Sequence, residues 1–192
     1  SKACAELVTS SFRQSFFNKL NIGLATARAG NVIGGGDWSQ DRLIPDFIRA
    51  QQSNNSLSIR NPKAIRPWQH VIEPVLGYLN LCERLYREPK KFSESWNFGP
   101  NDSDMKDVET LINEMQNNLS HTVNVELNKD ETKHEASLLK LDISKAKNKL
   151  NWESRWGFQE TIKHTANWYE HYYKKEDIFN FSLSQVNQYL SN

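Results

Sequence analysis

The sequence predicts an α/β fold. Stretches in which apolar residues recur at helical spacing alternate with short apolar or alternating runs that are typical of strands. The connections between them are short and carry Gly, Pro, Asn and Asp, which favour turns. This order is the pattern of α/β architecture, although an α+β arrangement fits the second half nearly as well. A length of 192 residues leaves room for one ordinary domain and too little for two comfortable ones.

The opening residues predict an amphipathic helix. Its apolar stripe, which we expect to face inward, consists of Leu7, Val8, Ser11, Phe12 and Phe16. No cap cluster or lead-in strand precedes this helix. Because a domain rarely begins inside an amphipathic helix, we expect the chain to be a piece of a longer protein.

The next segments predict a strand, a loop, a helix and a second strand. Residues 22–29 are typical of a short buried strand with small side chains, and residues 31–38 of a loop with three successive glycines. Residues 43–50 predict a helix, because Pro45 stands in its first turn, where a missing N–H is harmless. Residues 57–59 alternate as a brief strand does.

The second half continues the alternation. Residues 72–86 predict a helix whose inward stripe comprises Val75, Leu79, Cys82 and Leu85. The remaining expected elements are strands at 96–98 and 122–127 and helices at 104–119, 142–150 and 158–173. The tail beyond these helices receives no assignment.

Composition argues against several classes of protein. Lys plus Arg number 24 and Asp plus Glu 23, so no strongly basic face is implied and nucleic acid is a poor partner. No apolar run approaches the roughly 20 residues that span a bilayer, so we expect no membrane partner, and no secretory signal is evident near the start. Cys4 and Cys82 cannot form a disulfide framework, and free thiols indicate a cytoplasmic protein.

The sequence predicts neither a metal site nor a nucleophilic enzyme. His134 and Glu135 lack the second histidine of a helical zinc motif. Asp102 and Asp104 lack the glycine and the distal glutamate of a calcium loop. No Ser-His-Asp or Cys-His set can be defended. We therefore expect no bound metal.

The glycine run at 34–36 follows a strand, so a phosphate-binding role has to be weighed. Its spacing differs from the dinucleotide fingerprint, and no Gly-Lys-Ser/Thr follows it, so it is neither a Rossmann turn nor a P-loop. A turn that needs positive φ is the simpler interpretation. Asp37 and Trp38, which follow directly, keep a ligand-facing loop open as the alternative.

Several polar residues are candidates for ligand binding. Arg66 stands beside a proline and a tryptophan, and its guanidinium fork suits two phosphate oxygens; a solvated loop arginine is an equally good interpretation. Asn31 and Asn97 each end a strand, where ligands collect in open α/β sheets, although Asn there is often only a turn former. Arg28 stands inside an apolar strand, so we expect it to form a buried structural ion pair and not to bind a ligand.

Ordered segments of the chain resemble the extended short-chain dehydrogenases/reductases, the family of NAD-dependent nucleotide-sugar epimerases and dehydratases. Residues 1–6 resemble the end of its Tyr-x-x-Ser-Lys helix, and residues 28–31 its Arg-x-x-Asn motif. Further segments that resemble it, in the family's order, are 43–45, 66–71 and 96–99. Residues 27–38, and His134-Glu135-Ala136 with the segment after it, are most similar to the branch of dehydratases that act on CDP-glucose.

The resemblance implies the C-terminal part of a Rossmann-type NAD(P)-binding fold plus the family's small mixed α/β substrate-binding domain. Residues 1–35 would be the last helix and strand of the Rossmann domain. Residues 36–174 would be mostly the nucleotide-sugar-binding domain, with some segments returning to the Rossmann sheet, and residues 175–192 a C-terminal tail. The family's glycine-rich NAD turn, acid/base cluster and catalytic tyrosine would precede Ser1.

The resemblance also implies roles for single residues. Lys2 would be catalytic, bonding the nicotinamide ribose of NAD and lowering the pKa of the tyrosine by its charge, and Ala29 would line the cofactor. The implied substrate-binding residues are Asn31, Arg42, Leu43, Ser58, Arg60, Arg66, Asn97, His134 and Glu135. The last two stand where related dehydratases carry an arginine, which is a departure from the family pattern.

The implied function is a lyase reaction, the NAD-dependent dehydration of CDP-glucose to CDP-4-keto-6-deoxyglucose in deoxysugar and lipopolysaccharide biosynthesis. This chain would supply the substrate-binding half and be inactive alone. The complete protein would be a cytoplasmic homodimer or homotetramer. Two alternatives stay open: another nucleotide-sugar epimerase or dehydratase of the family, and a non-catalytic nucleotide-sugar-binding remnant.

Overall fold

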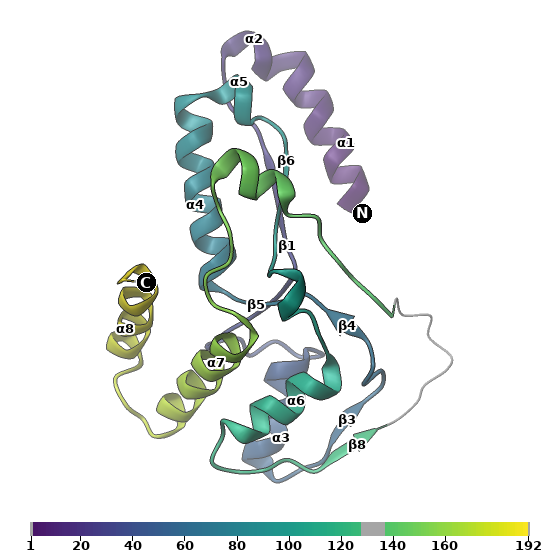
Figure 1. Ribbon diagram of the computed structural model, residues 1–192, viewed down its shortest axis with the longest axis vertical. Helices are drawn as coiled ribbons and strands as arrows, with labels where there is room; N and C mark the ends of the chain where they lie inside the picture. The colour runs from purple at the N-terminus through teal and green to yellow at the C-terminus, as the bar shows by residue number, and fades with distance from the viewer. Residues whose placement is uncertain (1, 128–136, 192) are drawn as a thin grey trace.

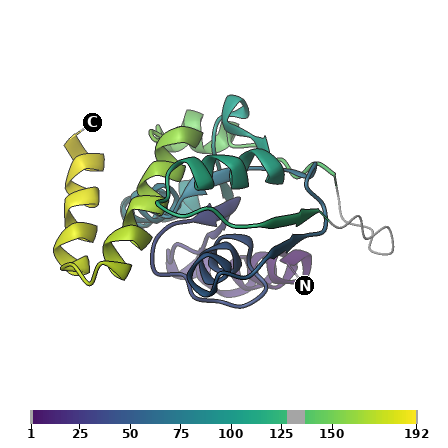
Figure 2. The ribbon, with the colours of Figure 1, turned by 90° about the horizontal axis from the view of Figure 1, so that it is seen from below.

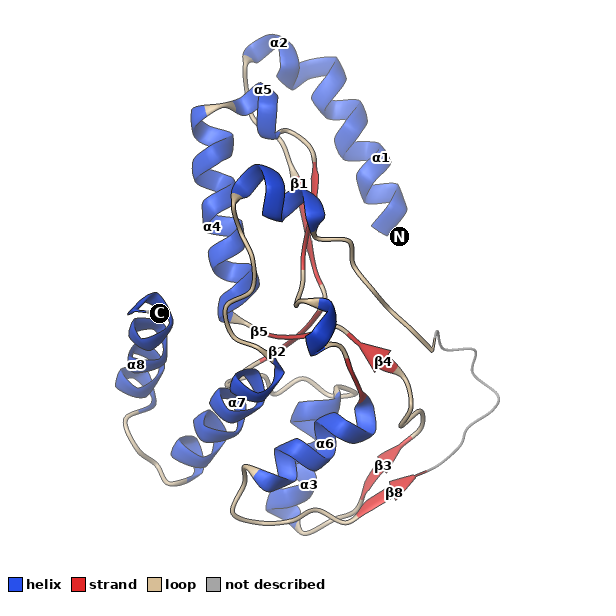
Figure 3. Ribbon diagram, viewed as in Figure 1, coloured by secondary structure: helices blue, strands red, loops and turns tan. Residues whose placement is uncertain are grey.

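A computed structural model describes residues 2–127 and 137–191 of the chain. Its α-helices are α1 (Lys2–Phe12), α2 (Asn18–Leu20), α3 (Leu43–Ser53), α4 (Ile72–Arg87), α5 (Pro89–Phe92), α6 (Val108–Asn117), α7 (Phe158–Tyr173) and α8 (Ile178–Ser191). Single turns of other helix types are η1 (Arg13–Phe17), η2 (Asp102–Asp104) and η3 (Ala146–Leu150). The strands are β1 (Thr26–Ala29), β2 (Asn31–Ile33), β3 (Leu57–Ile59), β4 (Ile65–Arg66), β5 (Trp68–His70), β6 (Ser95–Phe98), β7 (Lys106–Asp107) and β8 (Val125–Leu127). Helices are interspersed with single strands or runs of two or three strands along the chain (Figure 3), in keeping with the α/β prediction.

The strands form four pairs in the described part of the chain. Three pairs are parallel: β1 with β6, β2 with β5, and β3 with β8. The fourth pair, β4 with β7, is antiparallel. The predicted α/β class is therefore confirmed, in the mixed form that has both kinds of pairing.

The helices cover these strand pairs in two groups (Figure 1). In the upper part of that view, α4 and η3 flank β1 and β6, and the buried side chains between them include Leu81, Phe92, Trp96, Phe98, Leu150 and Trp152. In the lower part, α3, α6 and α7 enclose a larger core that includes Phe47, Ile48, Leu111, Ile112, Met115, Ile162 and Tyr169. Figure 2 shows α8 at one side of the molecule, next to α7. Within residues 2–127 and 137–191, every helix is too short or too polar to cross a lipid bilayer.

The apolar stripe of the opening helix does not face inward. No residue of α1 is buried, and Leu7 and Phe16 are 73% and 57% exposed. The prediction of an inward stripe is therefore wrong for the described residues. Helical spacing identifies an apolar face correctly, but it carries no information about whether the chain itself supplies the surface that covers that face.

Helix α4 is also turned differently from the prediction. Val75, Leu79 and Cys82 are exposed, whereas Gly77 and Leu81 are buried. Gly77 allows the close approach of β6, because a Cβ there would lie 2.5 Å from the Phe98 ring. Gly77 thus lets this face of α4 pack closely on β6.

A buried carboxylate, Glu73, joins α4 to the C-terminal helix. Its Oε1 accepts hydrogen bonds from the backbone N–H groups of Arg155 (3.0 Å) and Trp156 (2.7 Å), and its Oε2 accepts one from the Tyr189 hydroxyl (2.5 Å). Burial raises the pKa of Glu73 above its ordinary value, although these donors oppose the shift. Through Tyr189 this carboxylate holds α8, so the tail that received no assignment is a docked helix.

The elements that sequence patterns missed are very short. Strand β2 lies where a loop was expected, and β4, β5 and β7 were not expected at all. Other elements begin later than predicted: β1 at Thr26, α6 at Val108, β8 at Val125 and η3 at Ala146. A strand of two or three residues shows too little alternation for a period to be detected.

We expect His70 to make the stability of the chain depend on pH. Its ring is buried against Trp156 and His164, and this burial lowers its pKa to about 3. In the unfolded chain the ring titrates near its ordinary value of about 6.5. The unfolded state therefore binds the extra proton first as the pH falls. The free energy of unfolding then decreases by up to about 1.4 kcal/mol per pH unit between those two pKa values.

Urea unfolding between about pH 7 and pH 5 tests this expectation. The variant His70→Gln should show a smaller loss of stability on acidification than the wild-type chain, whatever its stability at neutral pH. The control His121→Gln, at an exposed position, should keep the wild-type slope. An equal slope in the His70→Gln chain would show that this ring does not cause the pH dependence.

Candidate functional site

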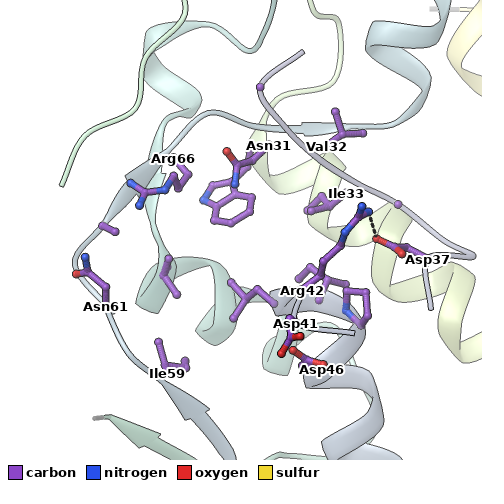
Figure 4. A pocket seen from close by; sticks show the side chains of 18 of the residues that line it. Asn31, Val32, Ile33, Asp37, Asp41, Arg42, Asp46, Ile59, Asn61 and Arg66 are labelled. Atoms are coloured by element: carbon purple, nitrogen blue, oxygen red, sulfur yellow. Dashed lines mark hydrogen bonds and ion pairs between the residues drawn. The ribbon is translucent and has the colours of Figure 1, made fainter. Parts of the chain in front are cut away.

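A cavity of about 1400 Å³ opens between β2, the start of α3 and the segment that joins β3 to β4. Apolar side chains line part of it, namely Ile33, Ile44, Ile59 and Trp68. Charged and amide groups lie among them (Figure 4). An apolar lining with a few polar groups among it is typical of a site for a small organic ligand.

Six of the residues implied as substrate ligands meet in this cavity. They are Asn31, Arg42, Leu43, Ser58, Arg60 and Arg66. They come from the start of β2, the entry to α3, and the stretch from β3 to β4, so only the tertiary fold brings them together. His134 and Glu135 lie outside the described residues.

Two arginines lie on different sides of the cavity. Arg66, on β4, is 7% exposed, and one of its terminal nitrogens donates to the carbonyl of Ile65 at 2.9 Å. Figure 4 shows Arg66 next to Asn31, with Arg42 across the cavity from them. Two guanidinium groups and an amide around one hollow favour a ligand with more than one anionic group.

An ion pair holds Arg42 at the cavity wall. The Nη1 of Arg42 donates to Oδ2 of Asp37 at 3.0 Å, and Oδ1 of Asp37 accepts a hydrogen bond from the Ser39 N–H at 3.0 Å. Burial by itself raises the pKa of Asp37, but the donors Ser39 and Arg42 outweigh it, so the net pKa lies below the usual range. Asp37 therefore carries a negative charge at neutral pH.

Helix α7 fixes the glycine run at the cavity edge. A Cβ at Gly35 would lie 2.0 Å from the Trp168 ring, and Gly36 has a φ of +81°. The Tyr169 hydroxyl donates to the carbonyl of Asp37 at 2.8 Å, and the Trp38 ring packs against Tyr169. The positive φ expected of this run is confirmed at Gly36, and close packing against Trp168 requires glycine at position 35.

These contacts from α7 were missed by sequence reasoning. The detectable signal was the group of aromatic residues at 168–173, which is large for the solvent side of a surface helix. Asp41, Asp46, Asn61 and Lys63 also line the cavity and were not predicted. They stand in turns and at element ends, where polar residues are common for reasons unrelated to ligands.

Three predicted site residues lie away from this cavity. Lys2 is exposed on α1, and Ala29 ends β1. Asn97, on β6, uses both ends of its amide: Oδ1 accepts from Nε of Arg28 at 3.0 Å, and Nδ2 donates to the carbonyl of Asp142 at 3.0 Å. Arg28 also pairs with Glu6 at 3.4 Å, so its predicted ion pair is confirmed, but its side chain is 38% exposed and not buried.

The cavity contains no group of side chains placed to hold a metal ion, as far as the structure describes the chain. Among residues 2–127 and 137–191, no three His, Cys, Asp or Glu side chains are placed to hold a metal ion. What the cavity walls provide is binding chemistry, with cations, amides and apolar surface around one hollow.

Solved structures with the same fold are nucleotide-sugar enzymes of the Rossmann type. A dTDP-glucose 4,6-dehydratase from Bacillus anthracis, solved in complex with NAD, matches 88% of this chain and 50% of its own length, with a TM-score of 0.68 and 20% identity. A UDP-glucose 4-epimerase from Stenotrophomonas maltophila with bound NAD matches 88% of this chain and 54% of its own length, with a TM-score of 0.71 and 14% identity. The fold is therefore that of Rossmann-type epimerases and dehydratases.

Sequence comparison is more specific. The pattern of the GDP-mannose 4,6 dehydratase family matches residues 1–165, so the chain belongs to that family. CDP-glucose 4,6-dehydratase of Salmonella typhimurium is 48% identical over 196 residues, covering all of this chain and 55% of the relative. The chain thus spans about half the length of the relative it matches.

We expect Gly35→Ala to destabilise the chain by about 1–3 kcal/mol, because the new methyl group overlaps the Trp168 ring and forces the loop or the helix to move. In a Trp168→Leu background the same change should cost much less. Gly99→Ala is the matched control, since its Cβ would lie at an ordinary 3.4 Å from Ile143. Urea unfolding measures the free energy of unfolding of each variant. If Gly35→Ala lowers it equally with and without Trp168, the proposed contact is contradicted.

Proposed function

We propose that this chain is the substrate-binding part of an NAD-dependent dehydratase that converts CDP-glucose to CDP-4-keto-6-deoxyglucose. The observation that carries the proposal is the cavity in which Arg42, Arg66 and Asn31 surround one hollow. Its charge pattern suits a diphosphate, and its apolar lining suits the rings on either side of one. The 48% identity to a CDP-glucose 4,6-dehydratase supports this particular substrate.

Each part of the cavity has a proposed role in binding. Arg66 and Asn31 would donate to the diphosphate, since a guanidinium fork matches two phosphate oxygens. Arg42 would approach it from the opposite wall, where Asp37 limits its rotamers before the ligand arrives. The adjoining residues Leu43, Ser58 and Arg60 would line the nucleoside, and His134 and Glu135 remain proposed ligands outside the described residues.

Lys2 and Ala29 would form one side of an NAD site. Lys2 makes no hydrogen bond or ion pair with any residue that the structure describes, so its ammonium is free to donate to ribose hydroxyls. Ala29 ends a parallel strand, and nucleotides bind outside the carboxyl ends of such strands. NAD, when bound, supplies reversible hydride transfer, oxidising C4 of the sugar and later reducing C6, so that the net change is loss of water.

Lys2 would act on protons through its charge. A positive charge near a phenol stabilises the phenolate and lowers its pKa, which prepares it to take the proton of the sugar 4-hydroxyl. We propose that the rest of the natural protein supplies this tyrosine and the glycine-rich turn, since the chain covers only 55% of its relative and contains no Gly-x-Gly-x-x-Gly. The exposed apolar faces of α1 and α4 are suitable surfaces for that part to cover.

We further propose that the complete protein works in the cytoplasm as a homodimer or homotetramer and serves lipopolysaccharide biosynthesis. Cys4 and Cys82 are both exposed free thiols, which a reducing compartment preserves. Deoxysugars made from nucleotide-sugars are building blocks of such surface polysaccharides.

The 192-residue chain alone should form no 4-keto sugar from CDP-glucose and NAD, because hydride transfer needs the cofactor held against the sugar. The longest natural protein that contains these residues should form it, as measured by absorbance of the 4-keto product. Turnover by the isolated chain would contradict the proposal that the rest of the natural protein supplies the catalytic tyrosine and the NAD-binding turn. A C4 epimer from the natural protein would identify an epimerase, and CDP-glucose binding without any product would identify a non-catalytic remnant.

Arg66→Ala in the natural protein should weaken binding of CDP and of CDP-glucose by a similar factor. Charge-assisted hydrogen bonds of this type are worth roughly 1.5–3 kcal/mol, or about one to two decades in affinity. Arg66→Lys should recover only part of the lost affinity, because an ammonium lacks the paired N–H donors of a guanidinium. Isothermal calorimetry measures the affinities.

The control for this series is Arg87→Ala, which removes an exposed arginine paired with Glu83 on α4, far from the cavity. It should leave CDP affinity unchanged. If Arg66→Ala also binds CDP with wild-type affinity while remaining folded, Arg66 is not a ligand of the diphosphate.

A further inference from the structure

Helix α1 is attached to the central strands by a carboxylate. No residue of α1 is buried, so apolar packing within the chain contributes little to its position. The Thr26 hydroxyl lies 2.8 and 2.9 Å from the two carboxylate oxygens of Glu6 and donates its one hydrogen between them, and Oε2 also accepts a hydrogen bond from the Ser95 hydroxyl. Glu6 therefore joins α1 to the first residues of both β1 and β6.

The attachment continues across the strand pair as a chain of polar contacts. Arg28, on β1, pairs with Glu6 at 3.4 Å and donates from Nε to Oδ1 of Asn97 at 3.0 Å. Asn97, on β6, donates in turn to the carbonyl of Asp142 at 3.0 Å. The hydrogen bond from Ser95 lowers the pKa of Glu6, and Thr26 and Arg28 add to this against the effect of burial. Glu6 is thus an anion held by donors from two strands.

Lys2 stands four residues before Glu6, so both side chains lie on the same side of α1, one turn apart. Residues later in the first helical segment contact residues earlier in the segment that contains β1: Arg13 donates to the Leu24 carbonyl, whereas Glu6 contacts Thr26 and Arg28. Helix α1 is therefore antiparallel to β1, as Figure 1 also shows. Lys2 consequently lies at the end of α1 that is directed toward Ala29 and the carboxyl end of β1.

We propose that Glu6 is a positioning residue for Lys2, and that Arg28 and Asn97 serve it by holding Glu6. This inference rests on the proposed function, because it assumes that Lys2 contacts the cofactor ribose. Asn97 then has a role different from the substrate contact that the family resemblance implies. Its amide oxygen and nitrogen are both engaged within the network, and it is not among the residues that line the cavity.

The test uses the longest natural protein that contains this chain and compares Glu6→Gln with Lys2→Met. Glutamine keeps the size of the side chain but loses the charge that pairs with Arg28. Glu6→Gln should lower kcat by at least about tenfold, since small misplacements of catalytic groups have effects of this size or larger. It should also weaken NAD binding and leave CDP affinity within about twofold. The matched control is Glu94→Gln, a carboxylate at the same end of β6 that pairs with Lys145 and Lys149, and it should change none of these.

A double-mutant cycle separates positioning from a general structural role. If Glu6 acts through Lys2, adding Glu6→Gln to Lys2→Met should have little further effect on kcat or on NAD affinity. Additive effects of the two changes would overturn the proposal. Asn97→Ala should have the same effects as Glu6→Gln, namely a lower kcat and a lower NAD affinity. Weaker CDP binding with unchanged NAD affinity would show that Asn97 is a substrate ligand instead.

The cycle on NAD affinity, measured by fluorescence titration, keeps this test independent of turnover. If the wild-type protein binds NAD but forms no 4-keto sugar from CDP-glucose, the proposed function fails and the cycle still decides the role of Glu6. Hydrogen exchange gives a second readout: the amides of α1 should exchange faster in Glu6→Gln than in the wild type. Unchanged exchange and unchanged NAD affinity would refute the inference.

Discussion

The cavity depends on two parallel backbone segments, those leading into β2 and β5, that lie in direct contact at Gly30 and Pro67. A Cβ at Gly30 would lie 2.8 Å from the Pro67 carbonyl, so a larger residue would force the segments apart. The carbonyl of Phe98 binds both of them, accepting from the Gly30 N–H at 3.1 Å and from Nε2 of Gln69 at 3.0 Å. Beyond this contact Asn31 pairs with Trp68, two positions after Arg66, so Asn31 and Arg66 both line the cavity.

The order of elements could be read from the sequence because the longer helices each repeat their pattern over several turns. Helices α4 and α7 lie within one residue of their predicted limits. The gathering of Asn31, Arg42 and Arg66 could not be derived from spacing, since they come from separate elements; only the family resemblance indicated it. The strands that shape the cavity, β2, β4 and β5, have two or three residues each, too few for a period.

Polar side chains inside the fold explain the other differences from prediction. Helical spacing assigns the apolar side of α4 to the interior, yet Glu73 is fully buried. Its carboxylate is stabilised there by hydrogen bonds from two backbone N–H groups and a tyrosine hydroxyl. The same reasoning failed for α1, where Glu6 meets the strands and Leu7 faces outward. A buried or half-buried carboxylate looks like a surface residue in sequence, since its donors are backbone groups and hydroxyls far away along the chain.

The attachment of α1 through Glu6 adds little to the free energy of unfolding, but it fixes the orientation of the helix. Partly exposed ion pairs contribute about 0–1 kcal/mol to stability, and the pair with Arg28 is of this kind. Apolar contacts are non-directional, so a helix that rests on them alone retains some freedom to rotate about its axis. Hydrogen bonds weaken steeply when their angles change, and Glu6 accepts them from β1 and from β6 at once. Two such donors on separate strands fix the rotation of α1, and with it the direction in which Lys2, one turn away, extends from the helix.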